Sequence, residues 1–250
     1  MATAELKAPP AWHAIDFISD LHLQASEAST VQAWQHYMQT TPANAIFILG
    51  DLFEVWVGDD ALLPGSFEED CAQVIAQAAA RAPVFFMHGN RDFLVGKGLM
   101  AACSMTLLAD PTVLTFNDQR WLLSHGDALC IDDTAYMAFR QQVRSAEWQA
   151  LFLAKPLAER QSIARGLREQ SEARKKSGVA YADVDATAAR QELLAAHATT
   201  LIHGHTHKPA EHDLGKGLRR VVLTDWDTTA APPRAEVMRL SASGLTRIAI

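Results

Sequence analysis

The stretch AIFILGDLFE, residues 45–54, places an uninterrupted apolar run directly before a glycine and an aspartate. A short apolar run bounded by turn residues is typical of a strand that is buried on both faces. Strands of this kind belong to parallel sheets whose two faces are covered. The stretch therefore predicts a buried strand with a polar side chain, Asp51, at its carboxyl end.

Other apolar runs end in the same way: AIDFIS at Asp20, PVFFMHG at Asn90, RWLLS at His125 and TTLIHG at His205. Helical patterns over about 29–40 and 67–81 separate the first three runs. The resulting βαβαβ order predicts a largely parallel sheet with right-handed crossovers. Further along the chain, TVLTF-NDQ-RWLLS and AEVMRL-SASG-LTRIAI have the pattern of hairpins, and RRVVLTDW that of another strand. These later strands predict a second, mixed sheet packed on the first.

The composition is that of an ordinary globular protein, with 250 residues, 49% hydrophobic and 20% charged. This length suits one large α/β domain. The net charge of −7 argues against a general nucleic-acid binder. The opening MATAELKAPPAWH lacks the basic and apolar regions of a signal peptide, which favours the cytoplasm. The scattered cysteines are predicted to be reduced and buried: Cys71, Cys103 and Cys130.

The residues at the strand ends are oxygen and imidazole ligands, which converge at the carboxyl edge of open α/β sheets. Carboxylates, an amide and histidines suit Mn²⁺, Fe²⁺ or Zn²⁺, and the absence of cysteine disfavours a structural zinc site. Taken singly, Asp20 or Asp51 could be a helix cap and His125 a core histidine. Their repetition at successive strand ends instead favours two ions about 3.5–4 Å apart, bridged by one carboxylate.

Five motifs follow one another in order: DLH at 20–22, GDLFE at 50–54, GNRD at 89–92, HGD at 125–127 and GHTH at 204–207. This ordered set resembles the calcineurin-like metallophosphoesterases. Longer stretches, among them HGNRDFLVGKG and LIHGHTHKP, resemble the branch of UDP-2,3-diacylglucosamine diphosphatases of the lipid A pathway. The resemblance implies an α/β fold of two packed mixed sheets flanked by helices. This four-layer α/β/β/α sandwich would form a single domain over residues 1–250, with a helical lid inserted at about 132–181.

The resemblance also implies which side chains hold the metal ions. One ion is expected at Asp20, His22 and His207, the other at Asn90, His125 and His205, with Asp51 as the bridge between them. Two divalent ions are expected, with Mn²⁺ the first choice among the metals that this ligand set tolerates. His203 and His88 each precede a motif glycine, and both are expected to lie outside the ligand set.

Arg91 stands where many members of the superfamily have a histidine that is proposed to protonate the leaving group. A leaving phosphate monoester, whose second pKa is about 6, does not need such an acid. An arginine can instead neutralise phosphoryl charge, so Arg91 favours a diphosphate substrate. The structural alternative is an ion pair with Asp92 or Asp127. The residues expected to act in catalysis and to contact the substrate are Asn90, Arg91 and His205.

The segment EWQALFLAKPLAERQSIARGLREQSEARKK, residues 147–176, combines apolar residues at helical intervals with a basic complement. This complement includes Arg160, Arg165 and Arg168. The composition suits contact with anionic lipid headgroups or with an acylated, phosphorylated ligand. The alternative is a solvated helical hairpin packed on the core. In the lid that the resemblance implies, the residues expected to contact the substrate are Asp133, Ser171, Lys175 and Lys176.

The implied activity is hydrolysis of UDP-2,3-diacylglucosamine by metal-activated water that attacks the α-phosphorus. The products would be UMP and 2,3-diacylglucosamine 1-phosphate, known as lipid X. The implied location is the cytoplasmic face of the inner membrane, with peripheral contact to anionic lipid and no nucleic-acid partner. No protein partner follows from the sequence. One alternative is a metallophosphoesterase for another nucleotide diphosphate or phosphodiester. The other is a non-catalytic binder with a vestigial site, against which the complete ligand set argues.

Overall fold

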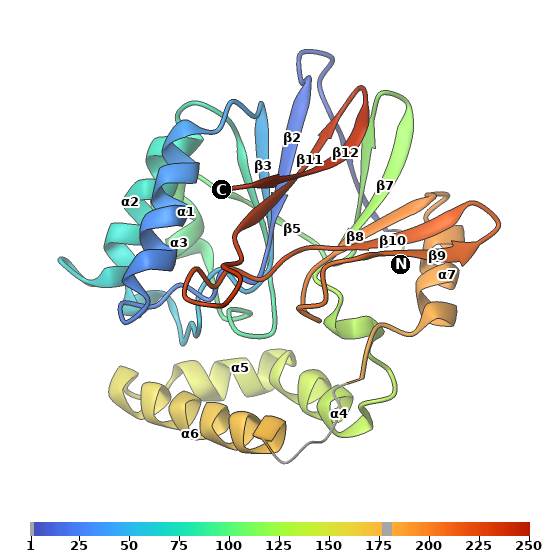
Figure 1. Cartoon of the computed structure of the whole chain (residues 1–250). Coiled ribbons are helices and arrows are strands. Elements are labelled where there is room, and N and C mark those ends of the chain that lie inside the picture. The colour runs from blue at the N-terminus through green and yellow to red at the C-terminus, as the bar shows by residue number, and fades with distance from the viewer. Residues whose placement is uncertain (1–2, 177–181) are drawn as a thin grey trace.

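The computed structural model describes residues 3–176 and 182–250, except for the side chains of 169–176. Two six-stranded sheets pack face to face, and helices cover both outer faces (Figure 1). The strand order is β12-β11-β2-β3-β4-β5 in the first sheet and β1-β6-β7-β8-β10-β9 in the second. Each sheet contains parallel and antiparallel pairs. The predicted α/β fold of two packed mixed sheets flanked by helices is confirmed.

The first sheet carries the predicted βαβαβ unit. Its strands are β2 (Ala14–Ile18), β3 (Ala45–Leu49), β4 (Val84–Met87), β5 (Thr106–Leu108), β11 (Glu236–Ser241) and β12 (Gly244–Ala249). The helices between the first four are α1 (Ala28–Thr40), α2 (Phe67–Ala79) and α3 (Lys97–Cys103). Strands β2 to β5 pair in parallel, each with the next. Their carboxyl ends therefore lie at one edge of the sheet.

The second sheet contains the predicted β6–β7 hairpin, whose strands pair antiparallel. Its strands are β1 (Ala4–Lys7), β6 (Thr112–Phe116), β7 (Gln119–Ser124), β8 (Thr200–His203), β9 (Glu211–Gly215) and β10 (Leu218–Val222), and α7 (Ala186–Ala195) packs on its outer face. Strand β1 was missed because its side chains are mostly exposed and carry no buried-strand pattern.

The C-terminal hairpin β11–β12 departs from the prediction. Strand β11 pairs antiparallel with β2, so the hairpin extends the first sheet and not the second. The physical reason is the alternation of its apolar residues between two cores. Met238 and Leu240 pack between the sheets, whereas Val237 packs beneath the helices that cover the first sheet.

Strand β3 shows why its sequence lacks polar residues. Ala45, Phe47 and Leu49 belong to the core between the two sheets. Ile46 and Ile48 belong to the core beneath α1 and α2. Both faces are thus removed from water, and full burial of one large apolar side chain contributes about 1.5–3 kcal/mol. The prediction for the cysteines is also confirmed, because all three are buried and free.

Helices α4 (Thr134–Val143), α5 (Ala146–Leu153) and α6 (Leu157–Lys176) form a further layer beneath the carboxyl ends of the first sheet (Figure 1). We call these three helices the helical layer. Phe152 is buried, and Trp148 stacks on it with ring centroids 4.7 Å apart. Arg160 is also buried and binds the Val57 carbonyl and Asp60, so this member of the predicted basic surface lies inside. Within the described ranges, every helix is too short or too polar to cross a bilayer.

Candidate metal centre

The predicted ligands lie in loops that follow strands: Asp20 and His22 after β2, Asp51 after β3, Asn90 after β4, His125 after β7, and His205 and His207 after β8. Gly204 allows the end of β8 to approach the first of these loops. A Cβ at Gly204 would lie 2.3 Å from Oδ2 of Asp20, closer than any carbon can come to an oxygen. The glycine of the GHTH motif is therefore required by the contact between the two sheets.

Most of the candidate ligands have a left-handed backbone conformation. The φ angles are 53° at Asp20, 48° at His22, 54° at Asp51, 67° at His205 and 52° at His207. Asp and His enter this region more readily than most residues, but a non-glycine residue still pays about 1–3 kcal/mol there. Such strain persists at functional sites because the surrounding structure enforces it. These loops are therefore shaped to aim side chains and not to minimise backbone energy.

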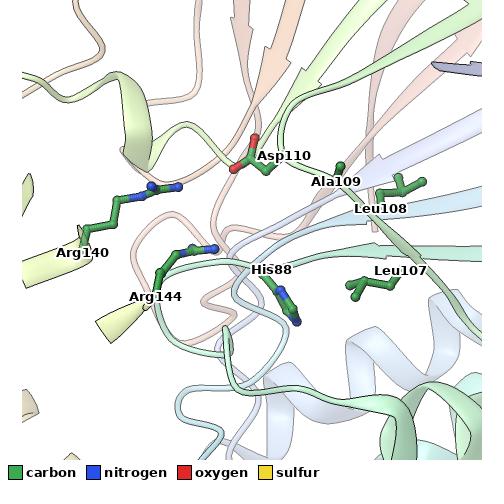
Figure 2. A pocket seen from close by; sticks show the side chains of 7 residues that line it. All are labelled: His88, Leu107, Leu108, Ala109, Asp110, Arg140 and Arg144. Carbon is green, nitrogen blue, oxygen red and sulfur yellow. The ribbon is translucent and has the colours of Figure 1, made fainter. Parts of the chain in front are cut away.

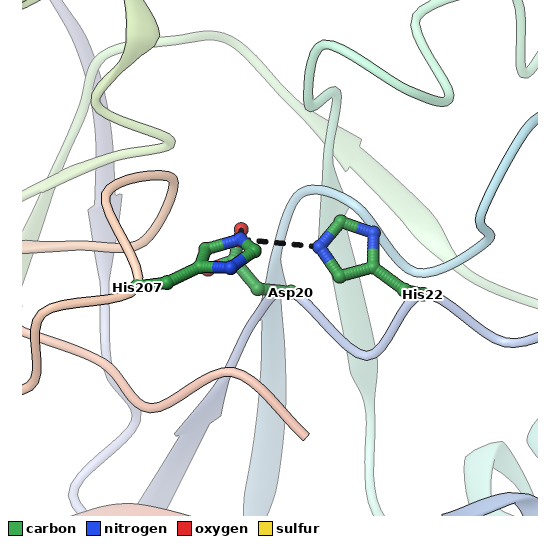
Figure 3. A group of neighbouring side chains, drawn as sticks. All are labelled: Asp20, His22 and His207. Atoms are coloured by element: carbon green, nitrogen blue, oxygen red, sulfur yellow. Dashed lines mark hydrogen bonds and ion pairs between the residues drawn. The ribbon is translucent and has the colours of Figure 1, made fainter. Parts of the chain in front are cut away.

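One group of donors consists of Asp20, His22 and His207, whose ligand atoms all lie within 4.8 Å of one another (Figure 3). The Nε2 atoms of the two histidines face each other at 3.2 Å. Nε2 of His207 also lies 3.4 Å from Oδ1 of Asp20. Two imidazole nitrogens and a carboxylate oxygen that point to the same place are a suitable arrangement for a shared cation.

A second group of donors consists of Asn90, His125 and His205. Oδ1 of Asn90 lies 3.0 Å from Nε2 of His125 and 2.7 Å from Nδ1 of His205. The other ring nitrogen of His125, Nδ1, lies 2.9 Å from the backbone carbonyl of Leu49. A proton on Nδ1 would bind this carbonyl and leave the lone pair of Nε2 available for a metal.

Asp51 lies between the two groups. Its Oδ1 is 3.8 Å from Nε2 of His125. Together with Asp20 and His125 it forms another set of donor atoms that lie within 4.8 Å of one another. The backbone N–H of Arg91 donates to Oδ1 of Asp51 at 2.8 Å and so fixes the carboxylate. This is the position that a bridging carboxylate requires.

Two of the candidate histidine ligands have charge states that suit metal binding directly. Burial lowers the pKa of His22 and of His205 to about 4, so both rings are neutral at pH 7 and have a lone pair to offer. Burial alone would also lower the pKa of His125. The carboxylates of Asp51 and Asp127 outweigh it and raise this pKa to about 9. A divalent cation would be stabilised by the same two carboxylates that favour the added proton on His125, and would replace that proton on binding.

The donor set consists of carboxylate oxygens, an amide oxygen and imidazole nitrogens, without a thiolate. This chemistry fits divalent ions such as Mn²⁺, Fe²⁺ or Zn²⁺. The structure brings together all of the predicted metal ligands, and each has a neighbour in the set within 3.8 Å.

The two histidines that were expected to lie outside the ligand set have other neighbours. Nδ1 of His203 lies 2.9 Å from the Gly204 carbonyl, and its Nε2 lies 3.4 Å from Nη1 of Arg220. Nε2 of His88 lies 2.8 Å from the carbonyl of Val95. Neither ring belongs to the groups of donor atoms described above.

Arg91 does not form the ion pairs suggested as its structural alternative. Asp92 accepts the backbone N–H groups of Leu52 and Gly89 at 2.7 and 2.8 Å. The partner of Arg91 is Glu54, at 2.5 Å. Sequence reasoning assigned no role to Glu54, although it is the last residue of the GDLFE motif. Its place in that motif was the available indication.

Asp127 fastens the helical layer to the metal centre. Its Oδ2 accepts hydrogen bonds from the Tyr136 hydroxyl at 2.7 Å and from Nε of Arg140 at 2.8 Å. Arg144 donates to the carbonyl of Gly89 at 2.9 Å. Burial alone would raise the pKa of Asp127, but His125 and these arginines hold it well below its usual range. Helix α4 is thus tied to the loops that carry His125 and Asn90.

A cavity of about 770 Å³ lies between the helical layer and the first sheet. Asn90 and Arg91 line it, and so does Asp133, a predicted substrate contact that also caps α4. The rest of the wall is largely apolar and aromatic and includes Phe53, Phe93, Phe139, Trp148, Phe152 and Leu167. The other predicted contacts in this region, Ser171, Lys175 and Lys176, lie on the last part of α6, whose side chains are outside the described residues.

A separate pocket of about 510 Å³ lies where α4 faces the segment after β5. Figure 2 shows Asp110, Arg140 and Arg144 around the same space. None of the candidate metal ligands lines this pocket. The cavity that reaches the metal centre is therefore the one beneath the helical layer.

The chain matches the calcineurin-like phosphoesterase family model over residues 13–209. It is 48% identical over 223 residues to the UDP-2,3-diacylglucosamine hydrolase of Chromobacterium violaceum, covering 85% of this chain and 90% of the relative. It is 43% identical over 248 residues to a Xanthomonas campestris protein of the same name, covering 92% and 96%. The chain therefore belongs to the calcineurin-like phosphoesterase family, and is a hydrolase whose donor groups fit the divalent metal ions that this family implies.

Proposed function

We propose that this chain hydrolyses UDP-2,3-diacylglucosamine to UMP and 2,3-diacylglucosamine 1-phosphate, a step of lipid A synthesis. The observation that carries the proposal is one cavity in which Asn90 and Arg91 of the candidate site share the lining with an apolar, aromatic wall beneath the helical layer. Such a cavity fits a substrate that joins a diphosphate to acyl chains. The name of the relatives supports the same substrate.

The metal-binding roles follow the two donor groups. Asp20, His22 and His207 would hold one ion, Asn90, His125 and His205 the other, and Asp51 would bridge them. Mn²⁺ is our first choice, because oxygen ligands and imidazoles both suit it. When bound, two such ions make water nucleophilic at neutral pH and neutralise charge on phosphoryl oxygens. Asn90, Arg91 and His205 would contact those oxygens, and Arg91 would take part of the charge in place of a general acid.

Cleavage is expected at the bond from the α-phosphorus to the bridging oxygen. The oxygen of water joins the α-phosphorus, and the bridging oxygen leaves with the sugar phosphate. The acyl chains would lie in the apolar part of the cavity, with Asp133 at its wall. Contacts from Ser171, Lys175 and Lys176 are part of the same proposal.

The test is hydrolysis of UDP-2,3-diacylglucosamine in ¹⁸O-water with Mn²⁺, with the products identified by mass. We expect one ¹⁸O atom in UMP and none in the sugar phosphate, and no turnover after removal of metal by EDTA. Label in the sugar phosphate would contradict attack at the α-phosphorus. Turnover of bis(p-nitrophenyl) phosphate without turnover of UDP-2,3-diacylglucosamine would contradict the proposed substrate.

We also propose that the helical layer contacts an anionic membrane surface, at the cytoplasmic face of the inner membrane. Leu151 and Leu153 on α5 are 66% and 42% exposed, and neither lines the cavity. Arg165 on α6 is exposed as well, although it also lines the cavity. Helices that present both exposed leucines and basic side chains are typical of surfaces that insert into the headgroup region.

Leu151→Asp should weaken binding to vesicles of phosphatidylglycerol and phosphatidylethanolamine by roughly tenfold, because one leucine no longer enters the acyl boundary. The matched control is Leu194→Asp on α7, where the leucine is 64% exposed. Co-sedimentation with the vesicles measures both variants. Equal binding by both, or wild-type binding that does not weaken with salt, would contradict the proposed surface.

A further inference from the structure

Glu54 is a buried carboxylate at the junction of the metal centre and the helical layer. It is 7% exposed. Its backbone N–H donates to the carbonyl of Leu23 at 3.1 Å, beside the bridge between Leu23 and Phe53. The backbone of Glu54 is therefore fixed, and its side chain has few directions open to it.

The carboxylate of Glu54 has three charged or imidazole neighbours from three parts of the chain. Its Oε1 accepts a hydrogen bond from Nη1 of Arg91, at 2.5 Å, and forms an ion pair with Arg168 of α6. Its Oε2 lies 3.3 Å from Nδ1 of His22. The Nε2 of the same imidazole points at His207 in the first donor group. One side chain therefore links a candidate metal ligand, a candidate substrate contact and the helical layer.

Two guanidinium groups, those of Arg91 and Arg168, share the carboxylate of Glu54. All three line the cavity next to Asn90, and both arginines are partly exposed there. An anionic group that enters the cavity meets two arginines already held close together. A phosphate monoester carries more negative charge than a carboxylate and offers more acceptor oxygens to an arginine.

We propose that Glu54 is a positioning residue that holds Arg91 and Arg168 together in the free protein and then yields both to the phosphate groups of the ligand. Its Oε2 also lies 3.3 Å from Nδ1 of His22, close enough to limit by contact how that ring can turn. This inference rests on the proposed function, because it needs a ligand with phosphate groups. Glu54 competes with the bound phosphate for the same guanidinium donors, so its charge weakens the binding of the product. Its contacts also keep Arg91 and Arg168 in position for turnover.

The test distinguishes this exchange from a purely structural ion pair by whether the affinity for the product rises or falls in a Glu54 variant. Glu54→Gln keeps the shape but removes the charge that competes with the ligand. We expect the affinity for 2,3-diacylglucosamine 1-phosphate, measured by titration calorimetry, to rise at least about tenfold, because a charged hydrogen bond no longer opposes binding. We expect kcat to fall roughly 10–100-fold, as for other residues that contact a metal ligand. A structural ion pair alone predicts that affinity and kcat fall together.

Further variants make the result decisive. Glu54→Asp keeps the charge on a shorter side chain, so its product affinity should stay near that of the wild type while kcat falls. The gain in affinity of Glu54→Gln should shrink when Arg168→Gln is added. The matched control is Glu236→Gln on β11, which removes a carboxylate that pairs with Arg247 of β12. It should change neither the product affinity nor kcat. Metal content and thermal unfolding of every variant are measured in parallel.

The outcomes distinguish this inference from the proposed function. A lower product affinity in a folded, metal-loaded Glu54→Gln variant would overturn the exchange, and so would a gain that Arg168→Gln leaves unchanged. In either case, wild-type turnover of UDP-2,3-diacylglucosamine would leave the proposed function standing. A wild-type protein that neither turns over this substrate nor binds the product would overturn both.

Discussion

Asp51→Ala is expected to abolish hydrolysis and to lower the metal content at both positions of the centre. Asp51 lies between the two donor groups, and its carboxylate belongs to one set of donor atoms with Asp20 and His125. A bridging carboxylate serves two ions at once, so its loss removes a ligand from each. Loss of a ligand at any other position would act mainly on one ion. We therefore expect Asp51→Ala to have the largest effect of any single substitution here.

The measurement is elemental analysis of purified protein alongside the hydrolysis assay. Asp51→Asn is the sharper companion variant, since its amide oxygen can still accept from the backbone N–H of Arg91. We expect it to fold like the wild type and still to lose metal, because an amide offers one neutral oxygen where a carboxylate shares a negative charge between two. Asp213→Ala, at an exposed carboxylate on β9, is the control. Full activity of the wild type in chelator, without transition metal, would rule out the assignment of the centre.

The three histidines of the LIHGHTHKP stretch should respond differently to substitution. His205→Ala and His207→Ala each remove a direct metal ligand, and each should lose on the order of several kcal/mol of transition-state stabilisation. His203→Ala should cost activity only in the range of about 10–100-fold, or less, because His203 contacts the Gly204 carbonyl and Arg220. Its loss should appear in the free energy of unfolding instead, by about 1–3 kcal/mol, because buried polar partners are left unsatisfied.

Steady-state kinetics and thermal unfolding, measured on all three alanine variants, test this division. Anomalous scattering from crystals grown with Mn²⁺ provides the direct observation. On a straight strand, residues two apart share a face, so simple strand alternation would point both His203 and His205 at the ions. An imidazole nitrogen of His203 about 2.0–2.2 Å from an ion, with His207 turned away, would mean that the triplet is assigned out of register.

The parts of the molecule that could be predicted are those in which the local residue pattern directly reflects burial in the fold. The run Ala45–Leu49 is apolar throughout because β3 has a core on both faces. The polar residue that ends each run lies at the sheet edge because parallel strands place their carboxyl ends together. An apolar run followed by a candidate ligand residue was thus enough to predict both the βαβαβ unit and the group of side chains at its edge.

The parts that were missed depend on partners that periodicity does not specify. Strand β11 has an ordinary hairpin pattern, and only the two cores that its faces enter determine which sheet it joins. Arg160 belongs to a basic helix, yet carbonyl and carboxylate acceptors from the loop after β3 draw it inside. Glu54 gains its importance from Arg168, more than a hundred positions away. No pattern within one segment contains these pairings.

The bonds from α4 to Asp127 and to the Gly89 carbonyl have a consequence for selectivity. A ligand too bulky for the cavity could make room by pushing α4 outward. Because that helix is fastened to the loops of His125 and Asn90, the same push would draw those two side chains apart. Selectivity for ligand size would then appear in the rate of turnover and not in binding. An oversized analogue would still bind, but would turn over slowly and act as an inhibitor.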